Sequence, residues 1–185
     1  KIDVNDFVVL RRLLQSSLYC NDSSLNEKDG QWAIQGAPTE GALLAMARKG
    51  KLQDGQVSRI ATIPFDSEYK YMATITSVSG KNYVFVNGAP ERLLSRSSKQ
   101  LSSDGSPEEL DESFWNSQIE KGASKGQRML GCAYYEPDEE FKDLEHKNLE
   151  GKLVFLGVCG LIDPPRPEAI EAVKLAGKSG IRVKM

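Results

Sequence analysis

Three strand-like runs in the first half of the chain follow one another with only short polar turns between them. They cover residues 57–63, 69–78 and 82–86, and Ser79-Gly80 begins the turn before the third run. Runs joined this tightly pair as hairpins, and hairpins place neighbouring strands antiparallel. We therefore predict that a mainly antiparallel sheet forms the centre of the fold.

Helix-like and strand-like segments surround these runs. Apolar spacing and helix breakers predict helices over 5–20, 38–49, 90–97, 110–125 and 167–178, and strands over 31–35, 128–135, 153–161 and from 181 onward. The segments 102–109 and 136–150 are expected to be loops, the second with helical turns. We expect Thr39 to cap its helix, and Phe114, Ile119 and Ala123 to face inward. The predicted fold class is α+β.

Composition excludes several classes of function. A net charge of −2 gives no electrostatic reason to bind nucleic acid. The longest apolar run, Leu153–Ile162, is about half the length needed to cross a bilayer. The three cysteines are far apart in sequence, and His146 is the single histidine, so we expect free thiols and no metal site made of protein groups.

The chain carries no glycine-rich phosphate loop of either common type. If a nucleotide binds, its purine must supply much of the affinity, through an aromatic or apolar slot. Phe65, between a strand and a turn, could stack on a base, although a buried role in the core is the alternative. Lys70, five residues later, could pair with a phosphate, or it could be a solvated lysine at a strand edge.

Other candidate side chains lie at the ends of predicted elements. Glu40 is in a first helical turn, where the helix dipole alone would favour a carboxylate, but it also shares the apolar face of that helix. Gly88 and Ala89 join a strand to a helix and would let a ligand approach the backbone, or they form an ordinary turn. Arg128 and Leu130 face the same side of a strand, and Arg can bind phosphate bidentately.

Five short motifs occur in one order along the chain. They are Gly-Ala-Pro-Thr-Glu-Gly-Ala-Leu-Leu (36–44), Pro-Phe-Asp-Ser-Glu-Tyr-Lys-Tyr-Met (64–72), Asn-Gly-Ala-Pro-Glu-Arg (87–92), Gly-Gln-Arg-Met-Leu-Gly (126–131) and Asp-Pro-Pro-Arg-Pro-Glu (163–168). The ordered set resembles the nucleotide-binding domain of P-type cation-transporting ATPases. The resemblance implies a twisted antiparallel sheet flanked by helices.

The resemblance also implies a site for ATP, which would bring Mg²⁺ with it. Phe65 would stack on adenine, Glu40 would accept a hydrogen bond from the adenine amino group, and Lys70 would lie in the pocket. Asn87 stands where the family usually has lysine, so it keeps hydrogen bonding without the charge. The implied nucleotide-binding residues are Glu40, Phe65, Asp66, Lys70, Met72, Asn87, Gly88, Ala89, Arg128 and Leu130.

The resemblance further implies a division of labour within a larger pump. Residues 1–161 would form the nucleotide-binding domain, and residues 162–185 a hinge and the truncated start of the phosphorylation domain. The phosphorylated Asp-Lys-Thr-Gly-Thr motif is absent, so we expect no catalytic residue here and no turnover by this fragment alone. The partners would be the phosphorylation and actuator domains and the membrane helices of the same pump, with this domain at the cytoplasmic face.

The motif variants resemble the branch that contains calcium, sodium/potassium and proton pumps. Calcium is the first expectation for the transported ion, and sodium or another monovalent cation the second. The alternative from the residues alone is a non-catalytic α+β domain that binds another ligand or a protein.

Overall fold

A seven-stranded sheet forms the centre of the computed structural model, which describes residues 3–28, 30–52, 54–138 and 141–184. The strand order is β3-β4-β5-β8-β9-β6-β7, and every neighbouring pair is antiparallel except β6 and β9. The strands are β3 (Val57–Asp66), β4 (Tyr71–Val78), β5 (Lys81–Gly88), β6 (Ser97–Leu101), β7 (Pro107–Glu109), β8 (Arg128–Tyr135) and β9 (Leu153–Leu161). The predicted α+β class with a mainly antiparallel sheet is confirmed.

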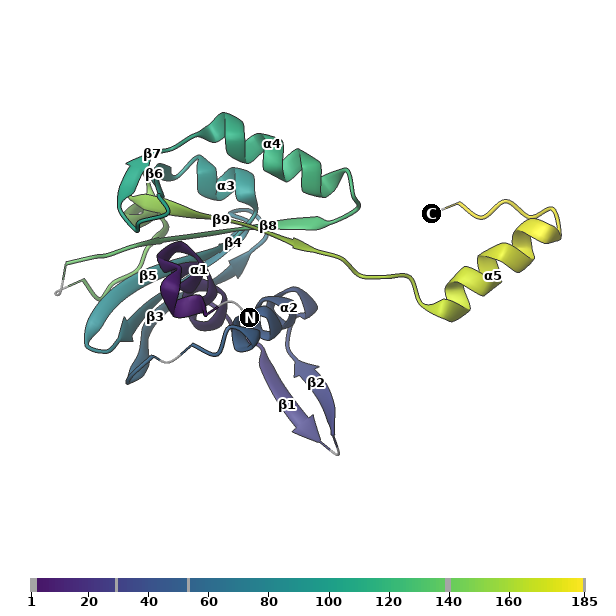
Figure 1. The fold of residues 1–185 in the computed structure, drawn as a ribbon, viewed down its shortest axis with the longest axis horizontal. Coiled ribbons are helices and arrows are strands. Elements are labelled where there is room, and N and C mark those ends of the chain that lie inside the picture. Colours follow the sequence, from purple (N-terminus) through teal and green to yellow (C-terminus); the bar gives the residue numbers. More distant parts are fainter. Residues whose placement is uncertain (1–2, 29, 53, 139–140, 185) are drawn as a thin grey trace.

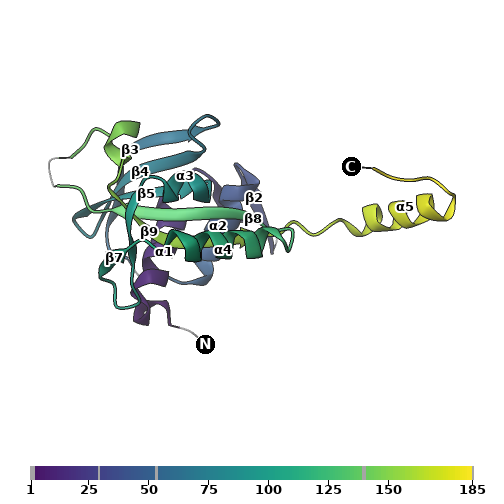
Figure 2. The same cartoon turned by 90° about the horizontal axis from the view of Figure 1, so that it is seen from above.

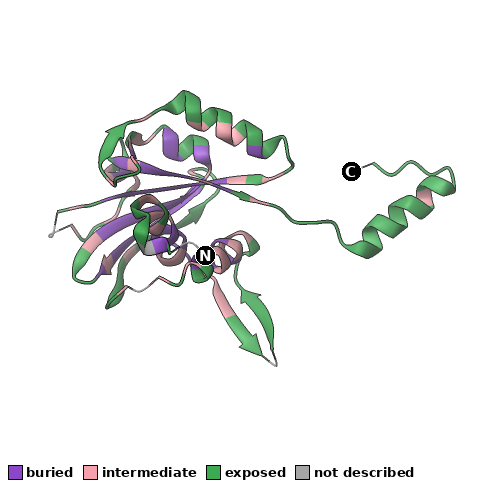
Figure 3. Ribbon diagram, viewed as in Figure 1, coloured by how far each residue is buried: buried purple, intermediate pink, exposed green. Residues whose placement is uncertain are grey.

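Helices cover both faces of this sheet (Figures 1 and 2). A short 3-10 turn, η1 (Val4–Asp6), precedes α1 (Val8–Tyr19), which packs with α2 (Pro38–Lys49) on one face. On the other face lie α3 (Pro90–Leu94), α4 (Glu112–Ala123) and a segment that contains the 3-10 turn η2 (His146–Leu149). The three layers bury β4, β5, β8 and β9 almost completely (Figure 3).

Two parts of the chain extend from this core (Figure 1). One is the hairpin of β1 (Ser24–Lys28) and β2 (Gln31–Gln35), anchored where Ile34 packs so closely on Gly41 of α2 that a Cβ there would come within 2.5 Å of it. The other is α5 (Pro167–Lys178), which is joined to β9 by residues 162–166. No residue of α5 is buried. None of the described helices is long and apolar enough to cross a membrane.

Strands with polar sequences were missed by the sequence analysis. Residues 24–28 were not among the predicted strands, residues 107–109 were predicted to be loop, and residue 97 was assigned to a helix that in fact ends at Leu94. β6 is a serine-rich strand that is held by its parallel pairing with β9, some 55 residues away in sequence. The strand predicted from residue 181 is absent within the described residues 181–184.

Two predicted helix details were also wrong. Ala37, in extended conformation, precedes α2, and Pro38 occupies the first helical turn, so Thr39 lies inside the helix and does not cap it. In α4, Ile119 faces inward as predicted, together with Trp115 and Gly122, whereas Phe114 and Ala123 are exposed. Trp115 is fixed in place by a 2.8 Å hydrogen bond from its Nε1 to Oε1 of Gln100.

Candidate functional site

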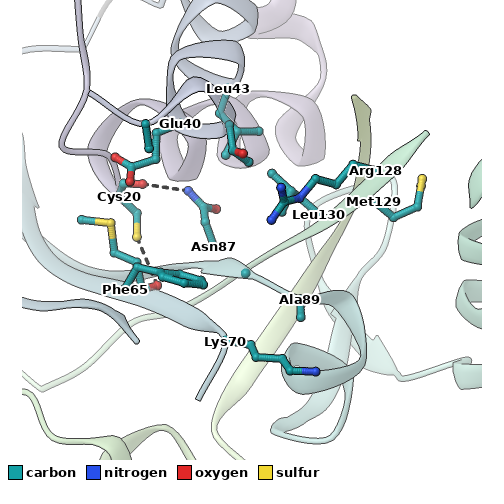
Figure 4. Close-up of a pocket in the computed structure, with 14 residues that line it drawn as sticks. Cys20, Glu40, Leu43, Phe65, Lys70, Asn87, Ala89, Arg128, Met129 and Leu130 are labelled. Atoms are coloured by element: carbon teal, nitrogen blue, oxygen red, sulfur yellow. Dashed lines mark hydrogen bonds between the residues drawn. The ribbon is translucent and has the colours of Figure 1, made fainter. Parts of the chain in front are cut away.

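A cavity of about 530 Å³ opens between the start of α2, the end of α1 and the ends of β3, β4, β5 and β8 (Figure 4). Nine of the ten predicted site residues line it: Glu40, Phe65, Lys70, Met72, Asn87, Gly88, Ala89, Arg128 and Leu130. Sequence reasoning missed the other five lining residues, which are Cys20, Ala37, Thr39, Leu43 and Met129. Four of the missed residues lie within the motifs 36–44 and 126–131, so membership of a motif is the signal that could have found them, whereas Cys20 lies outside every motif.

Phe65 lies near the end of β3, the edge strand of the sheet, with its side chain in the cavity (Figure 4). It is 59% exposed although it is a large aromatic residue. The alternative in which Phe65 belongs to the core is therefore wrong. A ring held this way at a rim offers one face to a planar ligand.

Glu40 lies in the first turn of α2, where the helix dipole favours its charge. Its Oε2 accepts a 2.6 Å hydrogen bond from the backbone N–H of Asp22, and its own backbone carbonyl accepts one from Nδ2 of Asn21. The carboxylate is therefore held at the edge of the cavity while Oε1 has no hydrogen-bond partner among the described residues. This second oxygen can accept a hydrogen bond from a ligand.

Asn87, on β5, is buried, with only 7% of its surface exposed. Its Nδ2 donates to the carbonyls of Ser16 and Cys20, each at 2.9 Å, and its Oδ1 accepts from the Ser16 hydroxyl at 2.8 Å. The amide thus supplies a bond to the Cys20 carbonyl just after α1, and a second bond to the Ser16 carbonyl, which also accepts from the backbone N–H of Cys20. At position 87, therefore, the amide joins a helix to the sheet and forms part of the cavity floor.

The thiol of Cys20 and the backbone of Met72 complete the floor. Cys20 is buried at the end of α1 and lies 3.3 Å from the Met72 carbonyl. Burial raises the pKa of the Cys20 thiol to about 12, with smaller opposing effects from hydrogen bonds. The thiol is thus protonated at neutral pH and is not an activated nucleophile.

The turn between β3 and β4 uses two predicted site residues for its own structure. Asp66 does not line the cavity; its Oδ1 accepts hydrogen bonds from the N–H groups of Glu68 and Tyr69. Lys70 has a left-handed backbone, with φ of 60°, and its side chain extends toward α3, where Nζ lies 3.7 Å from Glu91 (Figure 4). Both residues of this exposed pair are accessible to solvent, so a ligand could displace the contact.

Gly88 is required by the sheet itself. A Cβ at Gly88 would lie 2.4 Å from the Lys70 carbonyl and 2.6 Å from Cα of Tyr71, the residue paired with it on β4. The same carbonyl accepts a hydrogen bond from the Ala89 N–H. The glycine therefore allows close approach of two strands beside the cavity, a third role beside the ligand approach and the ordinary turn that the sequence left open.

Arg128 and Leu130 lie on the β8 side of the cavity, opposite Glu40 and Phe65 (Figure 4). Leu130 is buried and Arg128 is exposed. Arg128 forms no ion pair with any described residue, so its guanidinium is available to an anion. Across the cavity the structure thus places an aromatic ring, a carboxylate oxygen, an apolar wall and a cation.

Within the described residues, no group of three or more His, Cys, Asp and Glu side chains could hold a metal ion. His146 does not line the cavity; its ring is stacked on that of Tyr69, with 3.6 Å between the centroids, and its Nδ1 is hydrogen-bonded to the Tyr71 hydroxyl. The described residues that line the cavity therefore offer groups for binding a planar anionic molecule.

Comparison with known proteins assigns the chain to a family. Residues 9–168 match the family described as P-type ATPase, cytoplasmic domain N. The chain is 41% identical to the cation-transporting ATPase pma1 of Synechocystis, 34% identical to a calcium-transporting ATPase of Bacillus subtilis and 36% identical to the sodium/potassium exporting P-type ATPase cta3 of Schizosaccharomyces pombe.

These alignments cover 96%, 100% and 94% of the chain but only 20%, 22% and 17% of the relatives. The chain thus spans about a fifth of the length of the curated relatives that it matches. Both the matched region and the sheet-and-helix architecture agree with the resemblance drawn from the five motifs. The chain belongs to the family of the cytoplasmic domain N of P-type ATPases.

Proposed function

We propose that this chain binds ATP in the cavity and presents it to an aspartate of a neighbouring domain in a P-type ion pump. The observation that carries the proposal is the exposed ring of Phe65 at the rim of a cavity that also contains Glu40 and Arg128. A purine would stack on Phe65, donate its amino group to Glu40 and pack against Leu130. The phosphates would extend toward Arg128. They would also meet Lys70, once its side chain no longer pairs with Glu91.

Mg²⁺ would be held by the phosphates of ATP, since the described residues of the cavity supply no cluster of carboxylates for it. The bound ion would offset phosphate charge during phosphoryl transfer. The chain's own residues would bind and orient the nucleotide. None of Asp66, Asp104 and Asp163 is followed by Lys-Thr-Gly, so the phosphoryl acceptor would be an aspartate of the pump's phosphorylation domain.

The division at residues 161 and 162 is part of the same proposal. Residues 162–166 contain two prolines, Pro164 and Pro165, directly precede Pro167 of α5 and form neither helix nor strand, in keeping with a hinge. In α5, Ile170, Val173 and Leu175 are exposed, which is expected of a helix that packs in an adjoining domain. The whole pump would place this domain at the cytoplasmic face of a membrane.

For the transported ion we propose calcium first and sodium or another monovalent cation second. The relatives include proteins named as calcium-transporting and as sodium/potassium exporting. Transport of radiolabelled calcium and sodium by membranes containing the whole pump would decide between the two ions.

Calorimetric titration with ATP, AMP and GTP tests the binding proposal. We expect AMP to keep much of the affinity of ATP, since the purine supplies much of the contact, and GTP to bind more weakly than ATP. Equal binding of GTP, or no binding of any nucleotide, would favour the alternative of an α+β domain for another ligand or a protein. In a parallel incubation with γ-labelled ATP, hydroxylamine-sensitive label on the protein would contradict the role as a carrier domain.

A further inference from the structure

The guanidinium of Arg59, on β3, holds the turn that follows α1. It donates hydrogen bonds to the backbone carbonyls of Tyr19, at 3.0 Å, and Asn21, and it forms an ion pair with the carboxylate of Asp22. A planar guanidinium can make this fork of bonds, whereas an ammonium group is a compact point charge without the fork geometry. Arg59 therefore fixes the position and direction of residues 19–22.

The same turn holds Glu40 from the other side. The N–H of Asp22 binds Oε2 of Glu40 at 2.6 Å, and Nδ2 of Asn21 binds the Glu40 carbonyl at 2.8 Å. Arg59 does not line the cavity, but two of its three partners are the residues that hold Glu40. A continuous set of hydrogen bonds thus joins β3 to the carboxylate at the edge of the cavity.

The strand is irregular at the residue that supplies this guanidinium. The pairing of β3 with β4 shifts between Arg59 and Ala61, and Ile60 between them has no partner and is 42% exposed. Bulges of this kind re-aim side chains and are found beside functional sites. The irregularity places Arg59 where it can reach across to the end of α1.

We propose that Arg59 is a positioning residue for base selection, acting through Glu40. The inference rests on the proposed function, because it assumes that Glu40 meets the purine. With Oε2 bound to Asp22, Oε1 is directed at the ligand and accepts the 6-amino group of adenine. Guanine presents a carbonyl oxygen at the same place, and two acceptors repel each other. Arg59 would then control adenine affinity without touching the nucleotide.

Arg59→Ala tests this in the otherwise unchanged chain. We expect the dissociation constant for ATP to rise roughly three- to tenfold, as for the loss of one oriented hydrogen bond, and that for GTP to change by less than about twofold. The amide proton of Asp22 should also lose the downfield NMR shift that a carboxylate acceptor gives. Arg48→Ala, at the far exposed end of α2, is the matched control. It should change neither the ratio of ATP to GTP affinity nor the NMR shift of the Asp22 amide proton.

A double-mutant cycle with Glu40→Gln separates a positioning effect of Arg59 from a general effect of the substitution on the fold. If Arg59 acts through Glu40, adding Arg59→Ala to Glu40→Gln should weaken ATP binding by less than about twofold further. Arg59→Lys, which keeps the charge, should lose part of the selectivity and provides the test if Arg59→Ala does not fold. An unchanged ratio of ATP to GTP affinity in a folded Arg59 variant would overturn the inference. Failure of the unmodified chain to bind ATP would instead overturn the proposed function.

Discussion

At the floor of the cavity Asn87 is buried and its amide makes three hydrogen bonds to the end of α1, whereas at the rim Phe65 is 59% exposed and Arg128 has no ion-pair partner among the described residues. Both sets belong to the motifs that resemble a nucleotide site. The polar side-chain atoms of the floor residue Asn87 form bonds between α1 and the sheet. The side chains of Phe65 and Arg128 at the rim remain accessible to a ligand. Location in a motif therefore does not separate the residues that build a site from those that could bind a ligand.

Removing a floor residue should damage the fold most. Asn87→Ala removes the buried bonds from the Asn87 amide to the carbonyls of Ser16 and Cys20 and to the Ser16 hydroxyl, and we expect it to lower the free energy of unfolding by about 2–4 kcal/mol. Urea denaturation measures the loss. Asn82→Ala, at the other end of β5 and without a side-chain hydrogen bond to described residues, is the control. Equal effects of the two substitutions would mean that the floor network does not stabilise the fold.

Removing a rim residue should damage binding and leave the fold unchanged. Phe65→Ala should weaken ATP binding by about 1–3 kcal/mol, the range measured for base stacking on aromatic side chains. Because the ring is mostly exposed, the melting temperature should move little. Phe114→Ala, which truncates another exposed ring on α4, should leave ATP affinity unchanged. A Phe65 variant that unfolds would erase the contrast between rim and floor.

A smaller effect is expected at the opposite side of the rim. Arg128→Gln removes a cation at an exposed site, so we expect ATP binding to weaken by about 1 kcal/mol, less than a buried charged hydrogen bond would contribute. If Arg128 meets the phosphates, AMP should lose less than ATP in the same titration. Equal losses for the two nucleotides would place Arg128 beside the base or ribose.

The contrast also explains what could be predicted from sequence. The hairpin strands and long helices have local signals, and the motif residues that converge on the cavity lie at the ends of those elements. The role of Asn87 depends on partners 67 and 71 residues away, which no local pattern reveals. The strand β6 has a polar sequence and exists through its pairing with β9, and the inward face of α4 is set by a bond from Trp115 to Gln100.

The central claim is that a purine occupies this cavity with its base at the rim formed by Phe65. The most direct measurement is the map of backbone amide NMR shifts when ATP is added to the unmodified chain. The account predicts shifts concentrated at residues 40, 65, 70, 88 and 130, and little change at the opposite face around His146. Shifts elsewhere in the molecule, or an identical map of equal size with GTP, would contradict it.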